Sequence, residues 1–559
     1  MDDNAKDEGA LAPSRRTLMK GTAGAAAMAA LATPAARAHS SHHGGGGHPV
    51  LAEKAAIRRA KATKLRFEAA RDQLRPDLPR QQTNGDEAFA DKRASFFKTL
   101  PQNRFGEVNR QAYQKLLDAL ASGQQGDFDQ IPLARIAQRK LANPQGAYKY
   151  TLSGRDGQNT WMRPAPTFLG AETAAEMGEL YWKALCRDVP FSAYGSSPLI
   201  AAAVSDLNAF SATVGPKSGG SVTPETVFRG ETPGDLAGPY ISQLLTKPVP
   251  FGNTTIEQRY AAPAIGDDFM TTERSWRRVQ RGIAPPPLLK GNPRYISDAR
   301  ALGEFVHVDF TFQAYQSAAL ILLGIPGSFD IGNLYNTNST QGAFVSLGGP
   351  DVLDLVAKAG NLALTGAWYQ KWLVHRRARP EVYGGRLHFQ NTGERDYGLP
   401  QEILDSDGVG RTLAAQGTGF LSQAFPEGSP THPAYPAGHA TIAGACCTVL
   451  KAFFEESMAF PNPEEADATG QTLLPYSGTL TIGDEINKLA NNISLGRDWA
   501  GVHYRSDGVD GLSVGEQQAI SLLRDYSRTY SERFAGFTLT KFDGTRITIN
   551  DGEIDTAGA

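Results

Sequence analysis

The chain has 559 residues, of which 41% are hydrophobic, and its net charge at pH 7 is −2. This length exceeds what one hydrophobic core usually supports, so it allows two or more domains, and the near-neutral charge gives no sign of a nucleic-acid partner or of an acidic membrane surface. The three cysteines, Cys186, Cys446 and Cys447, are too few for a disulfide framework, and the adjacent pair is expected to pack in a core rather than bind a metal.

The N-terminal 50 residues have the pattern of an export signal and a leader. Ser14–Lys20 contains a pair of arginines and precedes an apolar, Gly/Ala-rich run that is too short to span a bilayer. Ala36-Arg37-Ala38 offers the small residues that a signal peptidase recognises. Residues 1–38 are therefore predicted to be a twin-arginine signal peptide that directs the protein to the periplasm or outside the cell. The His/Gly-rich residues 39–50 are expected to form a flexible leader.

Residues 51–290 are predicted to form a helical and loop-rich region. Its first part, to about Gly146, is charged and helical, as expected for surface helices or subunit contacts. Apolar residues at helical spacing predict a helix over 171–187. The Gly- and Pro-rich stretch 215–293 is expected to form long loops.

Residues 291–530 are predicted to be a helical catalytic region, with strong helices over 297–323 and 352–377. Residues 531–559 alternate in polarity around Asp543-Gly544 and predict a small C-terminal β-hairpin. The expected fold class is therefore mainly α, with long loops and this hairpin.

A loop-to-helix junction is predicted at Thr431–Ala440, which reads Thr-His-Pro-Ala-Tyr-Pro-Ala-Gly-His-Ala. Pro433 and Pro436 exclude a helix through this segment, whereas the apolar run 440–454 that follows is predicted to be a buried helix. His439 should therefore lie beside backbone N–H groups that have no helical partner, and such a helix N-terminus favours an anion. By itself the segment is equally compatible with a proline-rich turn capped by a histidine.

Two other stretches supply cations and a further histidine. One contains Lys371 and Arg379-Pro380, and the other contains Arg497 and Gly501-Val-His503-Tyr504. Together with the junction they could surround one tetrahedral oxyanion. Arg376 and Arg377 are predicted to be no more than the basic end of a helix.

The order of these three stretches resembles the vanadium-dependent haloperoxidases and the related type 2 phosphatidic-acid-phosphatase family. The extended match, which includes His432-Pro-Ala-Tyr-Pro436, is most similar to the algal-type bromoperoxidase branch and covers roughly residues 305–510. The resemblance implies a helical-bundle fold, a vanadate cofactor, and commonly a homo-oligomer.

The resemblance also implies roles for single residues. His503 matches the histidine that bonds vanadium, and His439 matches the acid–base histidine. Lys371, Arg379, Arg497 and Gly438 match the groups that hold the oxyanion. A buried oxyanion needs such paired donors to offset its desolvation.

Three further residues are assigned around this centre. His432 matches a second active-site histidine of bromoperoxidases, although a solvated loop histidine is the alternative. Trp368, about one helical turn before Lys371, is assigned to the halide pocket together with His432, with core packing as the alternative. Asp309 is predicted to lie in an apolar helix and to pair with an arginine or lysine of the site, with a surface position as the alternative.

One position departs from the family pattern. Ala437 stands where the family usually has serine, so one hydroxyl contact to the oxyanion is missing, at a cost of about 1–3 kcal/mol. This substitution leaves vanadate affinity, peroxide activation and halide preference open.

The expected function is oxidation of bromide or iodide by hydrogen peroxide to hypohalous acid, which halogenates organic substrates. The alternatives are an acid phosphatase that uses the same pocket, with His503 as nucleophile, and a non-catalytic oxyanion-binding shell protein. Neither a nucleic-acid nor a membrane partner is expected. Asp351 and Asp354 are candidate oxygen donors for a calcium ion, as in some red-algal relatives.

Overall fold

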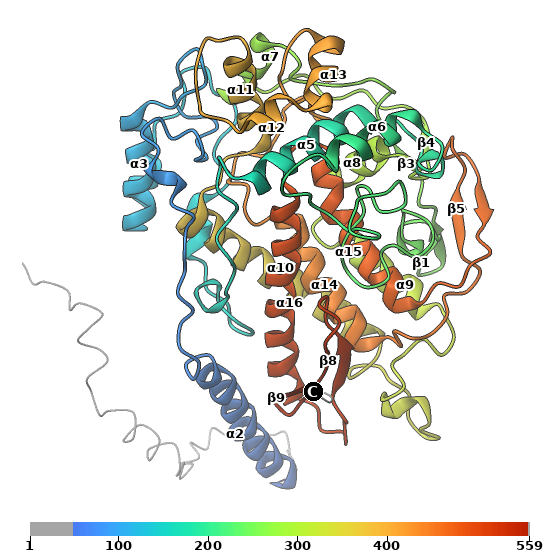
Figure 1. Ribbon diagram of the computed structural model, residues 1–559. Helices are drawn as coiled ribbons and strands as arrows, with labels where there is room; N and C mark the ends of the chain where they lie inside the picture. Colours follow the sequence, from blue (N-terminus) through green and yellow to red (C-terminus); the bar gives the residue numbers. More distant parts are fainter. Residues whose placement is uncertain (1–48, 557–559) are drawn as a thin grey trace, which may run out of the picture. The chain divides into compact units, whose positions relative to one another are not determined.

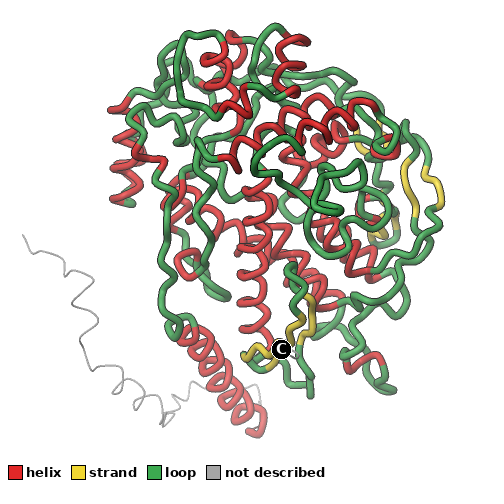
Figure 2. Tube along the Cα trace, in the orientation of Figure 1, coloured by secondary structure: helices red, strands yellow, loops and turns green. Residues whose placement is uncertain are grey.

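The computed structural model describes residues 49–556. The predicted signal peptide and most of the predicted leader lie outside these residues. Helices dominate the described chain, and the strands are short pieces among helices and long loops (Figure 2), so the mainly α prediction is confirmed. By its contacts the chain divides into residues 1–63 and residues 64–559. Within residues 49–556, no helix is long and apolar enough to cross a membrane.

A bundle around α14 (Gly438–Phe453) forms the centre of the second unit. Helix α14 packs against α10 (Gly349–Tyr369), α15 (Ile482–Trp499) and α16 (Arg505–Ser527), and α15 packs in turn against α8 (Ala299–Val308) (Figure 1). Small residues allow α14 and α16 to approach closely. A Cβ atom at Gly444 would lie 2.2 Å from the Leu512 carbonyl oxygen, and one at Gly515 would lie 2.0 Å from that of Thr441. Glycine is therefore required at both crossing points.

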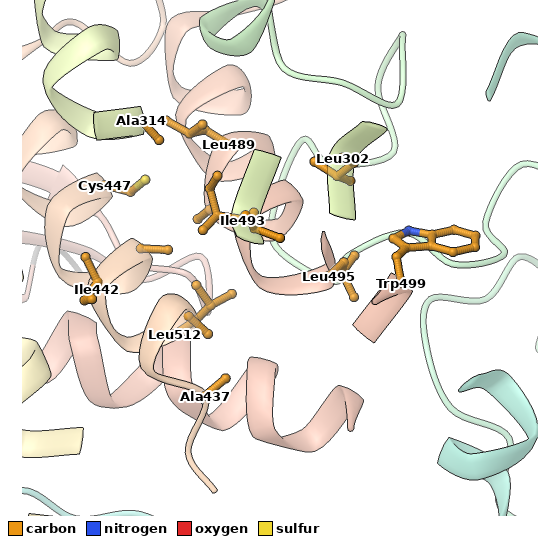
Figure 3. Packing of buried hydrophobic residues seen from close by; sticks show 14 of the residues in the cluster. Leu302, Ala314, Ala437, Ile442, Cys447, Leu489, Ile493, Leu495, Trp499 and Leu512 are labelled. Atoms are coloured by element: carbon orange, nitrogen blue, oxygen red, sulfur yellow. The ribbon is translucent and has the colours of Figure 1, made fainter. Parts of the chain in front are cut away.

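Apolar side chains of these helices share one core. Figure 3 shows Ile442 and Cys447 of α14 gathered with Ile493 of α15 and Leu512 of α16. Every residue of α14 except His439 is buried, as the apolar run predicted. Cys446 and Cys447 are fully buried, and burial raises the pKa of both thiols, so they behave as packing residues.

The described residues contain further helices outside this bundle. The remaining α-helices are α2 (Pro49–Asp72), α3 (Arg110–Ser122), α4 (Gln125–Asp129), α5 (Ala171–Cys186), α6 (Pro198–Leu207), α7 (Glu273–Gln280), α9 (Gln313–Leu323), α11 (Pro380–Asn391), α12 (Gln401–Leu404) and α13 (Asp407–Gln416). The short turns are η1 (Asp86–Ala88), η2 (Pro144–Tyr148), η3 (Gly157–Asn159), η4 (Phe191–Ala193), η5 (Gln243–Leu245), η6 (Leu334–Asn336) and the π-helical η7 (Gln370–His375).

Within the described residues, the strands form four small antiparallel sheets. They pair as β1 (Val249–Phe251) with β2 (Thr254–Ile256), β3 (Tyr260–Ala261) with β4 (Pro293–Arg294), β5 (Glu464–Ala466) with β6 (Leu473–Pro475), and β7 (Phe537–Thr540) with β8 (Arg546–Asn550) and β9 (Glu553–Thr556). The predicted C-terminal hairpin is the β7–β8 pair, and β9 extends it to three strands. Burial alternates along β7 and β8, with Leu539 and Ile547 facing the core.

The long helices differ from the predicted ones at their ends. The helix predicted over 171–187 is confirmed as α5. The helix predicted over 297–323 is in fact two, α8 and α9, because the chain is extended at Asp309. The helix predicted over 352–377 begins earlier, at Gly349, and passes from α10 into η7 before ending at Arg376 with a left-handed φ of 44°. A π-helical turn of this kind is often found at functional sites.

Candidate active site

A cavity of about 170 Å³ lies where four separate parts of the chain meet. It is lined by Asp309, Thr311, Tyr315, Leu364, Trp368, Pro430, His432, Gly438, His439, Ile442, Arg497 and His503. Seven of these residues were singled out from the sequence. The other two, Lys371 and Arg379, are fully buried and bonded to the same loops.

Lys371 projects from the π-helical turn η7 towards the loop before α14. Its Nζ donates to the carbonyl oxygens of Pro433 and Ala434, at 2.8 and 2.7 Å. An ammonium group has three N–H donors, so one remains for a ligand. Burial, followed by the positive charge of Arg379, holds the pKa of Lys371 well below its usual value.

Arg379 is the N-cap of α11 and connects three parts of the site. Its Nε donates to the His432 carbonyl oxygen, one terminal nitrogen donates to the Val502 carbonyl oxygen and to His503 Nε2, and the other donates to His432 Nδ1, all at 2.8–2.9 Å. Burial lowers the pKa of Arg379 to about 9. The guanidinium therefore holds His432 and His503 on one side of the cavity.

Arg497 lies in the last turn of α15. One terminal nitrogen donates to the Val306 carbonyl oxygen at 2.5 Å, whereas its buried Nε has no partner. Burial lowers the pKa of Arg497 to about 10, although Asp309 acts in the opposite direction. A buried cation with an unused donor is suited to an anionic ligand.

His503 lies in the turn between α15 and α16. Gly501 permits this turn, because its φ is +80° and a Cβ there would lie 2.7 Å from the Gln423 amide nitrogen. The Nδ1 of His503 donates to Asp507 Oδ2 at 2.8 Å, which leaves the Nε2 lone pair directed to the Arg379 side of the cavity. Burial, followed by Arg379 and Lys371, keeps the pKa of His503 far below its usual value, so the ring is neutral.

Asp507 belongs to a buried network that the sequence did not suggest. Its Oδ1 accepts from Arg377 at 2.8 Å, and Arg377 also donates to Glu176 of α5 at 3.1 Å. Burial by itself would lower the pKa of Arg377, but the negative charges of Asp507 and Glu176 outweigh burial, so the pKa of Arg377 is raised. The prediction that Arg377 is only a basic helix end is therefore wrong, whereas Arg376 does end η7, where it pairs with Glu87. The one sequence signal was the spacing of His503 and Asp507 by four residues at a helix start.

His439 and Asp309 form a pair at the opposite wall. His439 is in the first turn of α14, and its Nε2 is 3.0 Å from Asp309 Oδ1. The prediction that Asp309 lies inside a helix is wrong. Asp309 is the extended residue that ends α8. Its hydrogen-bond partner is this histidine rather than an arginine or lysine. The His439 side chain is 31% exposed, so it can exchange protons with solvent.

Trp368 and His432 stand side by side at the cavity wall. Their ring centroids are 4.8 Å apart with an interplanar angle of 47°. The indole N–H of Trp368 donates to the Asn143 carbonyl oxygen at 3.1 Å, which fixes the ring. Burial, followed by Arg379 and Lys371, keeps the pKa of His432 far below its usual value, so His432 is neutral.

The site has the chemistry of an oxyanion pocket. Among the described residues, no carboxylate forms an ion pair with Lys371, Arg379 or Arg497. Three buried cations without a counter-ion are costly, and a bound oxyanion would offset that cost. The first N–H groups of α14, at Gly438 and His439, add donors that have no helical acceptor. These residues therefore fit vanadate.

Ala437 is the N-cap of α14 and is fully buried at the edge of the core (Figure 3). Its N–H donates to the Asp507 carbonyl oxygen at 2.8 Å, so the backbone here is fixed against α16. In this chain α14 has no side-chain N-cap.

The candidate calcium donors are engaged in other contacts. Asp351 Oδ2 accepts from the Leu347 N–H and from the Tyr530 hydroxyl, and Asp354 pairs with Lys358. Within residues 49–556, no group of three or more His, Cys, Asp or Glu side chains could hold a metal ion. The calcium expectation thus has no support at these positions.

Comparisons with known proteins agree on one set of relatives. Residues 353–532, which carry most of the site, match the VCPO second helical-bundle domain. A vanadium-dependent bromoperoxidase of Ascophyllum nodosum is 34% identical over 510 residues, covering 84% of this chain and 90% of that protein. A vanadium-dependent bromoperoxidase of Corallina officinalis is 32% identical over 556 residues, covering 83% and 92%.

A solved structure agrees with these sequences. The homohexameric structure of the second vanadate-dependent bromoperoxidase from Ascophyllum nodosum matches with a TM-score of 0.86 and 29% identity, covering 95% of this chain and 96% of that chain. The similarity therefore extends over nearly the whole length of both chains.

Proposed function

Because this chain belongs to the family of vanadium-dependent bromoperoxidases, we propose that its cavity binds vanadate and oxidises bromide or iodide with hydrogen peroxide. The chain is a vanadate-dependent haloperoxidase. The observation that carries the site assignment is the meeting of three buried cations around a neutral histidine whose Nε2 accepts from Arg379. Among the described residues, none of the three cations is paired with a carboxylate.

The residues of the pocket divide the binding of vanadate between them. His503 Nε2 is the one protein atom proposed to bond vanadium, and Lys371, Arg379 and Arg497 balance the negative charge of its oxygens. The N–H groups at the start of α14 add neutral donors. When bound, vanadate acts as a Lewis acid that activates hydrogen peroxide for attack by halide.

The chain's own residues then orient and protonate the reactants. Asp309 holds His439 Nε2, so His439 Nδ1 is the atom that takes up and releases a proton at the cavity. Lys371 Nζ donates to two carbonyl oxygens, and its remaining N–H would hold an oxygen of the oxyanion. The apolar walls at Leu364, Trp368 and Ile442 limit water near this centre.

Bromide and iodide are the proposed halides because both are easier to oxidise than chloride. The position of His432 beside Trp368 supports this proposal, since His432 resembles a second active-site histidine of bromoperoxidases. The hypohalous acid produced would halogenate electron-rich organic molecules. The halide pocket is proposed to lie between Trp368 and His432.

Reconstitution with vanadate tests this function directly. The full chain should retain vanadium and brominate a phenol in the presence of hydrogen peroxide and bromide. His503→Ala should lose both properties, because it removes the vanadium-bonding atom. His388→Ala is the matched control: His388 is also a buried histidine, but it lies against Phe420, outside the cavity.

The alternatives give different results in the same experiment. An acid phosphatase would hydrolyse a phosphate ester and show no halogenation, and a non-catalytic shell protein would retain vanadium without turnover. Failure of the wild-type chain to retain vanadium, or full retention by a folded His503→Ala variant, would contradict the proposal.

Export and oligomer formation are also part of the proposed function. The arginine pair Arg15-Arg16 and the apolar run after it support twin-arginine export. A reporter protein fused after residue 50 should be exported, and the double substitution Arg15→Lys, Arg16→Lys should abolish its export. The homohexameric relative supports a homo-oligomer. Light scattering should then give a mass several times the 60.0 kDa of one chain.

A further inference from the structure

A half-buried histidine at the end of α8 is held by both of its ring nitrogens. His307 Nδ1 is 3.1 Å from Glu304 Oε2, and Nε2 is 2.8 Å from Glu427 Oε1. A neutral imidazole has one N–H, so only the imidazolium form donates to both carboxylates. Lys290 pairs with Glu304 at 2.5 Å and balances the second acid. This clamp, defined by Glu304, His307 and Glu427, connects α8 to the loop that carries His432.

The clamp places the His307 ring flat on Phe425. The ring centroids are 3.8 Å apart and the planes differ by 10°. Phe425 is buried and packs with Ala500 and Val502, in the turn that leads to His503. The neighbouring Ala424 N–H donates to the Ala500 carbonyl oxygen at 3.1 Å. Phe425 is therefore the point where the clamp meets the wall of the active site.

Arg497 contacts the same ring. Its guanidinium carbon lies 5.3 Å from the Phe425 ring centroid, which is within cation–π range. Arginine has five N–H donors, yet Arg497 has one hydrogen bond to the described chain, to the carbonyl oxygen of Val306. Hydrogen bonds alone therefore leave its orientation weakly specified. Packing against Phe425 supplies the missing restraint.

We propose that His307 is a positioning residue for oxyanion binding: held by Glu304 and Glu427, it fixes Phe425, and Phe425 orients Arg497 towards the cavity. This inference rests on the proposed function and extends it to residues that do not touch the ligand. Val306 and Asp309, on either side of His307, contact Arg497 and His439. The end of α8 thus sets the position of groups on both sides of the cavity.

Calorimetric titration of the vanadate-free full chain with inorganic phosphate measures oxyanion affinity without turnover, and this affinity reports how Arg497 is positioned. His307→Ala should weaken phosphate binding about tenfold. Phe425→Leu should weaken phosphate binding by the same factor, and this variant tests the inference if His307→Ala does not fold. His388→Ala is the matched control, since its ring also lies on a phenylalanine, Phe420, with centroids 4.2 Å apart. It should lower stability and leave phosphate affinity unchanged.

A double-mutant cycle identifies the route. In an Arg497→Lys background, which keeps the charge but loses the planar face, His307→Ala should weaken binding much less than tenfold. Wild-type affinity in folded His307→Ala and Phe425→Leu would overturn the inference, as would an equal loss in His388→Ala or an undiminished loss in the Arg497→Lys background. If the wild-type chain binds neither phosphate nor vanadate, the proposed function fails instead.

Discussion

Asp507→Asn tests whether the carboxylate behind His503 prepares it to bond vanadium. Asp507 accepts three hydrogen bonds with its two oxygens, from His503 Nδ1 at 2.8 Å, the Tyr504 N–H at 3.1 Å and Arg377 at 2.8 Å. Asparagine keeps one acceptor oxygen and replaces the other with an N–H₂ donor. One of the buried donors, on His503 or on Arg377, then faces another donor.

The expected loss follows from these contacts. Partners behind a metal-bonding histidine typically change metal affinity 10–100-fold, so vanadate binding should weaken by about 1.4–2.7 kcal/mol. Removing one charge from a buried ion pair costs about 3–5 kcal/mol. The fall in unfolding free energy should lie near the lower bound, because Arg377 keeps Glu176.

Vanadate titration by calorimetry and denaturant unfolding measure the two quantities separately. Asp525→Asn is the matched control. Asp525 is also a buried acid of α16, 18 positions further on and therefore about 27 Å along the helix, where it accepts from the Gly154 N–H. It should leave vanadate affinity unchanged. Wild-type affinity in folded Asp507→Asn, or an equal loss in Asp525→Asn, would refute this explanation of how His503 is oriented.

Three further predictions concern the oxyanion and its donors. Phosphate should compete with vanadate for Lys371, Arg379 and Arg497, so vanadium should dissociate faster in phosphate buffer than in a sulfonate buffer; equal retention would place vanadium elsewhere. The pKa of Lys371 is lowered in the folded, ligand-free chain, so the unfolded chain keeps that proton to higher pH. The free energy of unfolding should therefore rise as the pH increases from the folded pKa of Lys371 towards its ordinary value of 10.5. Phosphate affinity should fall over the same interval, because binding needs the charged form of Lys371. Calorimetry and denaturant unfolding at several pH values measure the affinity and the stability, and a pH-independent affinity would contradict this prediction. Ala437→Ser should strengthen oxyanion binding modestly, or cap α14 and stabilise the fold by about 1 kcal/mol if its hydroxyl turns to the helix N–H groups instead; no change in either measurement would mean that position 437 faces neither.

Local patterns were sufficient to predict several elements. Helix α5, the buried helix α14 and the β7–β8 hairpin follow from apolar spacing and from a turn at Asp543-Gly544. The same patterns failed at Asp309 because apolar residues continue on both sides of it. Periodicity does not show where a chain must break to carry a side chain into a cavity.

Three acids behind the site, Glu176, Glu427 and Asp507, could not be predicted as a set. Arg377 and Glu176 are 201 positions apart, and His307 and Glu427 are 120 apart. Acids such as these look like ordinary charged positions on helices or loops in the sequence. Only the tertiary structure shows that Glu176 and Asp507 are buried and that Glu427 reaches His307 from a loop.

The sequence by itself determined which groups could form the proposed site: Lys371, Arg379, His439, Arg497 and His503 lie in three short stretches whose residue types suit an oxyanion and whose order resembles that in the vanadium-dependent haloperoxidases. The tertiary structure alone decided how those groups are held. It gave His439 the partner Asp309, and it gave His503 a protonated Nδ1 through Asp507. The physical reason is that chemical identity is local in the chain, whereas burial, charge pairing and the direction of a side chain depend on tertiary packing, which brings together residues as distant in sequence as Asp309 and His439.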